Sequence, residues 1–272
     1  MNGRSRRRIA ATAAALALLL VSVVIGLQSC KKDEPRPEPV VVAQGAAAQK
    51  IITPTPAAAP AAGTASVKGT VTLTGTPPEM APTKRDADPF CAKTPMKEEE
   101  VVVGKNGGLK NVIVRITKGL TGNYEPPMTS VTLDQTACMY RPRVTMLMAG
   151  QSLLIKNSDQ TLHNVHTYKG ASTLFNQAEV PGLPAIAKTF KDATGEILKF
   201  KCDVHPWMTA YVGVMGHPFF AVTGDDGGFE IPKVPPGTYT LEAWHERYGT
   251  KTTQITVSAN QPVEAKFAFD AK

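Results

Sequence analysis

The sequence predicts an all-β protein that is built from β-sandwiches. Short runs of β-branched and aromatic residues recur along residues 66–272, and no long stretch repeats its apolar residues with a helical period. Turn-forming sequences such as Asn106-Gly107-Gly108 and Pro235-Pro236-Gly237 separate these runs. We allow one short helix, around residues 172–177. The expected strands are 67–73, 112–116, 130–133, 144–148, 152–155, 197–200, 211–215, 219–222, 239–244 and 252–257.

Composition excludes several classes of protein. The chain has 272 residues, of which 42% are apolar, too many for a disordered protein, and its four Cys are too few for a disulfide-built miniprotein. The formal charge is +7, but four Arg lie within residues 1–29, which contain no acidic residue. The remainder carries 26 basic and 23 acidic residues, a net charge of +3. The basicity is therefore mainly a targeting feature, and we expect no nucleic-acid partner.

The first 29 residues have the layout of a secretory signal peptide. Arg4 to Arg8 form a positive region, and residues 9–27 are predominantly apolar. The sequence Leu27-Gln28-Ser29-Cys30 then resembles the lipobox of bacterial lipoproteins. This resemblance implies that Cys30 is the lipidated first residue of the mature chain. The alternative is an uncleaved transmembrane anchor, since 19 apolar residues can just span a bilayer. Both readings place the rest of the chain outside the cytoplasm.

Residues 30–65 read as a lipid-anchored linker. Residues 31–65 contain 6 Pro and 10 Ala in 35 positions, a composition that buries little surface and favours extended conformations. Such a tether would let a folded head leave the membrane surface, in the periplasm or cell envelope. By analogy with bacterial lipoproteins, Lys31 and Lys32 in place of an acidic residue after Cys30 favour the outer membrane.

Two separated stretches resemble one known type of sandwich. The C-terminal sequences of residues 220–229 and 234–241 resemble the carboxypeptidase-regulatory-like, transthyretin-type domain, and residues 66–73 and 108–114 resemble its opening strands. We therefore expect one such domain made from residues 66–124 and 217–272. A second β domain, residues 125–216, would be inserted into it. The alternative is two sandwiches in simple series.

The most informative motif lies in residues 201–208. Cys202, His205 and Met208 have the spacing C-x2-H-x2-M directly after an expected strand, and His163 lies 39 residues before Cys202. Two imidazoles, one thiolate and one thioether are the ligand set of a blue-copper centre. One short loop can present three of these ligands, and a distant strand must supply the fourth.

At these residues the chain resembles the cupredoxins of the amicyanin and plastocyanin type, over residues 129–216. The resemblance implies His163, Cys202 and His205 as equatorial ligands of one copper ion and Met208 as its axial ligand. It also implies that Asn164 forms hydrogen bonds that hold the thiolate loop in place. Because four protein ligands leave no open position for a substrate, the resemblance favours an electron carrier over an enzyme.

The remaining cysteines are interpreted in the light of this site. With Cys30 lipidated, Cys91, Cys138 and Cys202 would lie in an oxidising compartment, where an odd thiol needs an explanation. Metal ligation by Cys202 provides one if Cys91 and Cys138 form a disulfide between the two domains. The alternative places Cys202 in a disulfide.

Other histidines and one tryptophan have weaker assignments. His166 would face away from His163 on a strand. His217 and His245 are left open as a second metal site, with Glu242 or Glu246. Trp207 is expected near an exposed edge of His205, where it would shape a docking surface, or else pack between the domains.

The sequence thus predicts a membrane-tethered blue-copper protein that transfers single electrons. Its redox partner would be a cytochrome or another copper protein. One alternative is copper storage or delivery, and another is an envelope scaffold or adhesion role with incidental copper binding.

Overall fold

The computed structural model describes residues 63–271, and all its regular elements are strands except two short 3-10 turns. These turns are η1 (Cys91–Lys93) and η2 (Lys105–Gly107). The all-β prediction is confirmed for this part of the chain. The expected signal peptide, Cys30 and the linker up to residue 62 lie outside the described residues. Among residues 63–271 no helix is long and apolar enough to cross a membrane.

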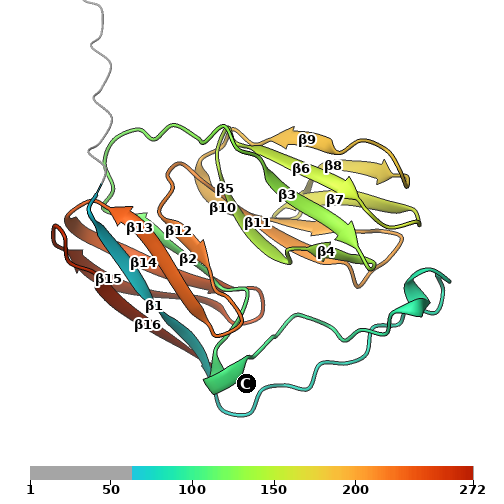
Figure 1. Cartoon of the computed structure of the whole chain (residues 1–272), viewed down its shortest axis with the longest axis horizontal. Coiled ribbons are helices and arrows are strands. Elements are labelled where there is room, and N and C mark those ends of the chain that lie inside the picture. Colours follow the sequence, from blue (N-terminus) through green and yellow to red (C-terminus); the bar gives the residue numbers. More distant parts are fainter. Residues whose placement is uncertain (1–62, 272) are drawn as a thin grey trace, which may run out of the picture. The chain divides into compact units, whose positions relative to one another are not determined.

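The first sandwich combines strands from both ends of the described chain (Figure 1). In one sheet, β1 pairs antiparallel with β13 and parallel with β16. The other sheet has the order β12-β2-β14-β15. The strand bounds are β1 (Ala65–Thr74), β2 (Ile113–Lys118), β12 (Phe220–Val222), β13 (Gly228–Val234), β14 (Gly237–His245), β15 (Gly249–Val257) and β16 (Val263–Asp270).

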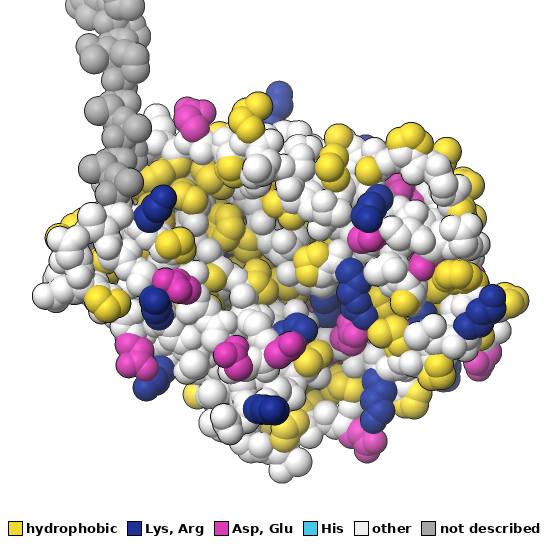
Figure 2. Space-filling model, in the orientation of Figure 1, with side chains coloured by type: hydrophobic (Ala, Val, Ile, Leu, Met, Phe, Trp, Pro, Cys, Tyr) yellow, Lys and Arg dark blue, Asp and Glu magenta, His cyan; other side chains and the backbone are white. Residues whose placement is uncertain are grey.

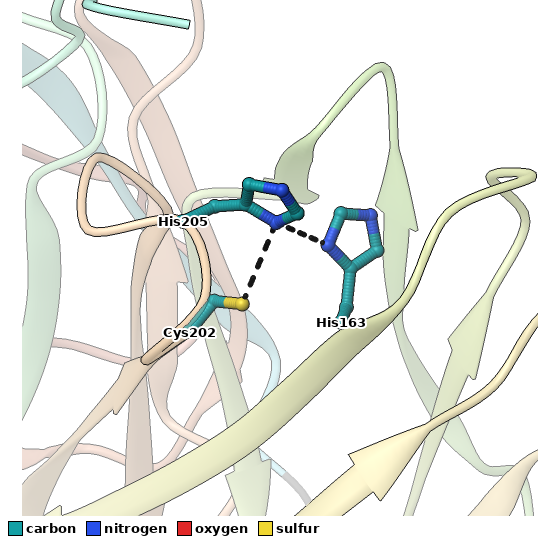
Figure 3. A group of neighbouring side chains, drawn as sticks. All are labelled: His163, Cys202 and His205. Carbon is teal, nitrogen blue, oxygen red and sulfur yellow. Dashed lines mark hydrogen bonds between the residues drawn. The ribbon is translucent and has the colours of Figure 1, made fainter. Parts of the chain in front are cut away.

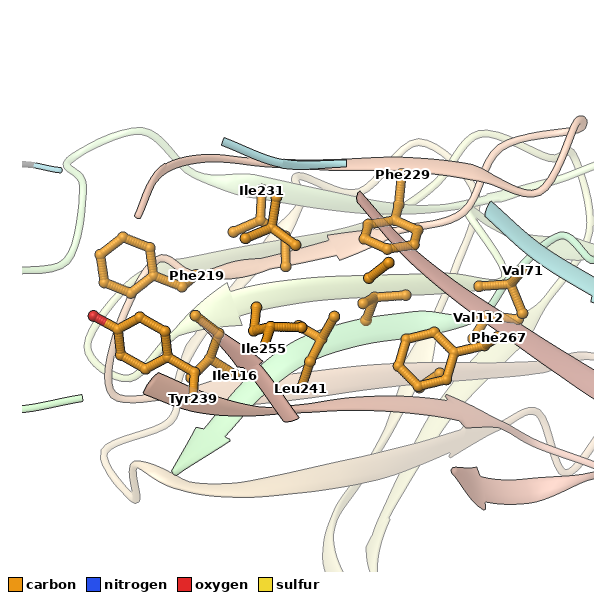
Figure 4. Close-up of a cluster of buried hydrophobic side chains, with 14 of the residues drawn as sticks. Val71, Val112, Ile116, Phe219, Phe229, Ile231, Tyr239, Leu241, Ile255 and Phe267 are labelled. Atoms are coloured by element: carbon orange, nitrogen blue, oxygen red, sulfur yellow. The ribbon is translucent and has the colours of Figure 1, made fainter. Parts of the chain in front are cut away.

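Alternation along these strands produces the core of the first sandwich. In β14, Tyr239, Leu241 and Ala243 are buried while the residues between them are half-buried or exposed. They pack with side chains from the other sheet, among them Val71 and Phe267 (Figure 4). Burying one large apolar side chain contributes about 1.5–3 kcal/mol, so this face stabilises the sandwich.

The second sandwich lies between β2 and β12 in the sequence. One sheet has the order β4-β3-β6-β9, and the other has the order β5-β11-β10-β7-β8. Large buried side chains such as Leu133, Ile155 and Phe200 form its core. The strand bounds are β3 (Val131–Thr136), β4 (Met139–Arg141), β5 (Val144–Met148), β6 (Ser152–Asn157), β7 (His163–Lys169), β8 (Ser172–Glu179), β9 (Ile186–Thr189), β10 (Thr194–Lys201) and β11 (Thr209–Met215).

Each of the ten expected strand segments overlaps an observed strand. The helix expected at residues 172–177 is wrong, because these residues belong to strand β8. β8 is an edge strand that pairs only with β7, and most of its side chains are exposed. A strand exposed on both faces lacks the apolar alternation that would identify it.

A long segment between β1 and β2 leaves the first sandwich and extends to the turn between β3 and β4 before it returns (Figure 1). We call residues 83–97 of this segment the cap segment. Its two ends are joined by a hydrogen bond from the Thr83 N–H to the Met96 carbonyl (2.9 Å). Arg85, which is buried, donates hydrogen bonds to the carbonyls of Thr94 and Ala137. The cap segment is thus attached to the turn before β4.

Side chains from both sandwiches also share a small core. Ile113 of β2 packs with Val144 and Met146 of β5 and with Met215 of β11. Arg143, just before β5, forms a buried ion pair with Glu246, just after β14 (2.6 Å).

On the surface, basic and acidic side chains are interspersed on the face drawn in Figure 2.

Candidate metal centre

Two neighbouring strands bring the candidate ligands together. His163 opens β7, Cys202 directly follows β10, and His205 and Met208 lie in the loop between β10 and β11. Because β7 and β10 pair antiparallel, with His166 opposite Lys201, the start of β7 lies beside the end of β10. Figure 3 shows the side chains of His163, Cys202 and His205 pointing toward one another.

The ligand atoms of these three residues form one compact buried group. The Nδ1 atoms of His163 and His205 are 2.9 Å apart, and the Cys202 Sγ lies 3.8 Å from the His205 Nδ1. All three atoms lie within 4.8 Å of one another. Donors bonded to one ion at about 2.0–2.3 Å are expected roughly 3–4 Å apart. The group could therefore hold one metal ion.

The outer nitrogen of each imidazole contacts a carboxylate. His163 Nε2 lies 2.9 Å from Asp159 Oδ2, and His205 Nε2 lies 3.0 Å from Asp88 Oδ2. We assign the Nε2 protons to these hydrogen bonds, which leaves the Nδ1 lone pairs facing each other. Such a pair of lone pairs needs a proton or a cation between them. Together with a sulfur donor, this donor set fits copper.

Electrostatics favours the ligand form of Cys202. Burial alone would raise the pKa of the Cys202 thiol, but hydrogen bonds from His163 and His205 and from the Asn164 N–H lower it to about 6. Burial would lower the pKa of His163, whereas Asp159 and Cys202 raise it above its ordinary value. Without a metal, the site therefore favours a thiolate beside a protonated imidazole. A metal ion would displace that proton.

Hydrogen bonds define the conformation of the ligand loop. The Met208 N–H donates to the His205 carbonyl (2.9 Å), and the Cys202 N–H donates to the Met208 carbonyl (3.3 Å). Asn164 joins the loop to β7, because its Oδ1 accepts the Asp203 N–H (2.6 Å) and its own N–H lies 3.5 Å from the Cys202 Sγ. The Met208 side chain is fully buried in the same core as Cys202.

The disulfide prediction is confirmed, and the bridge lies beside the candidate site. Cys91 and Cys138 are bonded, and Cys202 is the free cysteine of the described residues. The Cys91 Sγ lies 3.6 Å from the His205 Nε2. The bridge therefore joins the cap segment to the second sandwich at the edge of the His205 ring.

The expectation of an exposed His205 edge is wrong. His205 is only 2% exposed, because Asp88 and Cys91 of the cap segment cover its outer nitrogen. The Trp207 ring lies 5.1 Å from the His205 ring, and its Nε1 donates to the Cys138 carbonyl (2.9 Å). Trp207 thus packs beside the disulfide, and Arg85 of the cap segment lies over its ring.

The other histidines lie outside this group. His166 faces away from the site and contacts Asp203 (3.0 Å). His217 Nε2 donates to the Ile116 carbonyl, and its Nδ1 accepts the Phe219 N–H. His245 Nδ1 accepts the Arg247 N–H. Among residues 63–271, no group able to hold a metal includes His217 or His245, so a second site there is not supported.

Sequence reasoning missed the two carboxylates. The position of Asp159, four residues before His163, was a weak indication in the sequence. In the structure its oxygens also accept the N–H groups of Ala137 and Cys138. Asp88 carried none, because it lies in an irregular segment 117 residues before His205. Only the folded chain brings it to the site.

One family model matches part of the chain. Residues 208–270 match the family model of the carboxypeptidase regulatory-like domain. This match begins at Met208, directly before β11 of the second sandwich, and extends to the end of β16. A search of curated protein sequences finds no match.

Solved structures similar to part of the chain include a cupredoxin and several amicyanins. A purple cupredoxin from Nitrosopumilus maritimus is 21% identical, with a TM-score of 0.28, and the match covers 31% of this chain and 99% of that one. Amicyanin from Paracoccus versutus is 22% identical, with a TM-score of 0.28, and covers 37% of this chain and 96% of its own. A reduced amicyanin mutant is 20% identical, with a TM-score of 0.29, covering 36% and 99%.

Proposed function

We propose that this protein binds one copper ion at His163, Cys202, His205 and Met208 and transfers single electrons. The observation that carries the proposal is the convergence of one buried sulfur and two buried Nδ1 atoms within 4.8 Å. A buried Met208 in the same core supports a weak fourth donor. Copper, when bound, would supply a one-electron couple between the cupric and cuprous states.

The protein's own residues would hold the donors in place during this exchange. Hydrogen bonds within the loop and from Asn164 restrain Cys202 and His205. The Tyr140 hydroxyl donates to the carbonyls of Asn164 (2.7 Å) and Lys201 (3.1 Å), which ties the two ligand-bearing strands together. A restrained donor set changes little between oxidation states, and this favours fast electron exchange.

The sequence supports a location for this activity. We propose that Cys30 anchors the chain to a membrane of the cell envelope through lipid, and that the Pro/Ala-rich residues 31–65 act as the tether. A cytochrome or a second copper protein would then exchange electrons with the tethered head. Mass spectrometry of the membrane-extracted protein would detect the lipid on Cys30.

Copper loading of the purified full chain tests the proposed function. We expect one copper per chain, an intense visible band from thiolate-to-copper charge transfer, and reversible reduction. Cys202→Ser should remove the band, because the hydroxyl cannot replace a soft thiolate. Thr209→Ser, a comparable change just after the ligand loop, should retain it.

The alternatives give different results. Colourless protein that holds only exchangeable cuprous ion would favour copper storage or delivery. Protein that binds no copper, with Cys202 free to react with alkylating reagents, would contradict the proposal. An unchanged envelope phenotype with Cys202→Ser would favour the scaffold role.

A further inference from the structure

We propose that Asp88 of the cap segment is a positioning residue of the copper centre, which orients His205 and strengthens its donation to the cupric ion. This inference rests on the proposed function. Asp88 lies outside the second sandwich, yet its Oδ2 is 3.0 Å from the His205 Nε2. A carboxylate at the outer nitrogen of a ligand imidazole fixes the tautomer and makes the ring a stronger donor.

The Asp88 carboxylate is itself held in a single orientation. Its Oδ1 accepts the N–H groups of Phe90 (2.7 Å) and Cys91 (3.1 Å), and its Oδ2 also accepts the Thr161 hydroxyl (2.7 Å). Together with the contact to the His205 Nε2, these hydrogen bonds fix the direction in which the carboxylate faces the ring.

Several contacts prevent the cap segment from moving away. The Cys91–Cys138 disulfide bonds it to the turn before β4, and Arg85 donates to the Ala137 carbonyl of the same turn. The Cys91 Sγ lies 3.6 Å from the His205 Nε2, on the same side of the ring as Asp88. Rotation of the His205 ring would have to break the bond to Asp88 and displace this covalently held segment.

The two ligand imidazoles receive their carboxylates from different parts of the chain. Asp159, which serves His163, comes from the second sandwich, four residues before its partner. Asp88, which serves His205, comes from the segment between the strands β1 and β2 of the first sandwich. The second sandwich alone would therefore lack one of the two orienting groups. This makes the cap segment part of the metal centre.

Asp88→Asn in the full chain removes the charge of the carboxylate and keeps the shape of the side chain. We expect cupric affinity to fall by roughly 10–100-fold, as for other carboxylates behind a ligand imidazole. Cuprous affinity should fall less, because the lower metal charge gains less from a stronger donor. Each tenfold difference between the two losses raises the reduction potential by about 59 mV. Chelator competition and voltammetry measure these three quantities. Asp86→Asn, an exposed change in the same segment, should leave all three unchanged.

Equal losses of cupric and cuprous affinity with an unchanged potential would overturn the proposal, since Asp88 would then act only on folding. A second measurement does not depend on copper. Nitrogen NMR of the metal-free chain should show His205 with its proton on Nε2, and Asp88→Ala should give mixed tautomers. An unchanged tautomer would also overturn it. The wild type could also fail to bind copper while His205 shows the expected tautomers. This outcome would contradict the proposed function but not the role of Asp88 in orienting His205.

Discussion

Both imidazoles of the candidate metal centre are contacted from two sides. The Nδ1 atoms of His163 and His205 face each other near Cys202, while their Nε2 atoms face Asp159 and Asp88. A carboxylate oxygen thus lies at the outer nitrogen of each ring. At the scale of single residues, Met208 differs from the two histidines, because its proposed role depends on its buried sulfur rather than on a side-chain hydrogen bond.

Met208→Leu tests the axial role. Met208 is fully buried, and a volume-conserving Met-to-Leu change should cost less than about 1.5 kcal/mol of folding stability. Copper should still bind, but the reduction potential should rise, because the cupric ion loses a sulfur donor and gains an apolar neighbour. Met146→Leu is the matched control, since Met146 is buried in the small core shared by both sandwiches. Identical potentials in the two variants would rule out Met208 as a ligand.

The buried His245 predicts a pH dependence of stability that is separate from the metal site. Burial, followed by the nearby charges of Arg143 and Arg247, lowers the pKa of His245 from 6.5 to about 4. Its ring stacks on Tyr248 (5.0 Å), and Phe269 lies beyond (6.3 Å). Between pH 6.5 and 4, His245 therefore binds a proton in the unfolded chain but not in the folded chain. The stability of the folded chain falls as pH falls through this window.

His245→Phe should reduce this dependence. One proton bound only by the unfolded chain lowers the free energy of unfolding by about 1.4 kcal/mol per pH unit. His245 alone should therefore cost the wild type on the order of 3 kcal/mol across the window. Urea unfolding of the metal-free protein at pH 7 and at pH 4.5 measures the slope. The variant should be the less pH-sensitive of the two. Equal slopes for the wild type and the variant would mean that His245 has the same pKa in the folded and the unfolded chain.

At the scale of elements, the sequence predicted strands that are rich in buried apolar residues. Segment 144–148 coincides with β5, whose side chains pack into both the core of the second sandwich and the small shared core. Strand β8 was mistaken for a helix because its polar residues face solvent on both sides. The expected segments also left out β4, β7, β9, β13 and β16. Length alone does not explain these omissions, because β16 has eight residues, whereas the three-residue β12 was expected.

The sequence predicted the candidate ligands, three of which the structure brings together, but not their surroundings. Cys202, His205 and Met208 lie in one loop, so their spacing is visible in the sequence. Asp88 and the burial of His205 depend on a segment from a distant part of the chain. Long-range contacts of this kind follow from the topology and leave no local pattern.

The cap segment should control access to the metal-free site. With Cys91→Ser and Cys138→Ser together, the bond that ties the segment to β4 is lost, and folding stability should fall by about 2–4 kcal/mol. The segment should open more often and admit alkylating reagents to Cys202, which is buried in the folded chain. Peptide mass spectrometry locates the label. Labelling of Cys202 as slow as in the wild type would show that other contacts, such as those of Arg85, close the site without the bridge.

At the scale of the whole described chain, the two sandwiches are connected by more than the backbone. The first sandwich takes β1 and β2 from before the second sandwich and β12 to β16 from after it. Whether each folds as an autonomous domain stays a prediction. Limited proteolysis tests it, because release of residues 66–124 as an independently folded piece would contradict the inserted arrangement.

The Arg143–Glu246 pair should couple the unfolding of the two sandwiches. Both side chains are almost fully buried (6% and 4% exposed), and two hydrogen bonds join them. Glu246→Gln leaves the Arg143 charge uncompensated, which should cost about 3–5 kcal/mol. By contrast, Glu230→Gln should cost less than about 1 kcal/mol, because the Lys68–Glu230 pair is exposed.

The two tryptophans of the chain make this coupling measurable. Trp207 lies beside His205 in the second sandwich, and Trp244 lies on β14 of the first. Trp207→Phe and Trp244→Phe therefore each leave one fluorescent reporter. In otherwise wild-type protein the two reporters should give the same urea midpoint, since the shared core and the buried ion pair join the sandwiches. Adding Glu246→Gln should separate the two urea midpoints, because without the ion pair the unfolding of one sandwich no longer destabilises the other. Midpoints that stay together despite a large loss of stability would assign the coupling to the apolar contacts of Ile113 and Met146 instead.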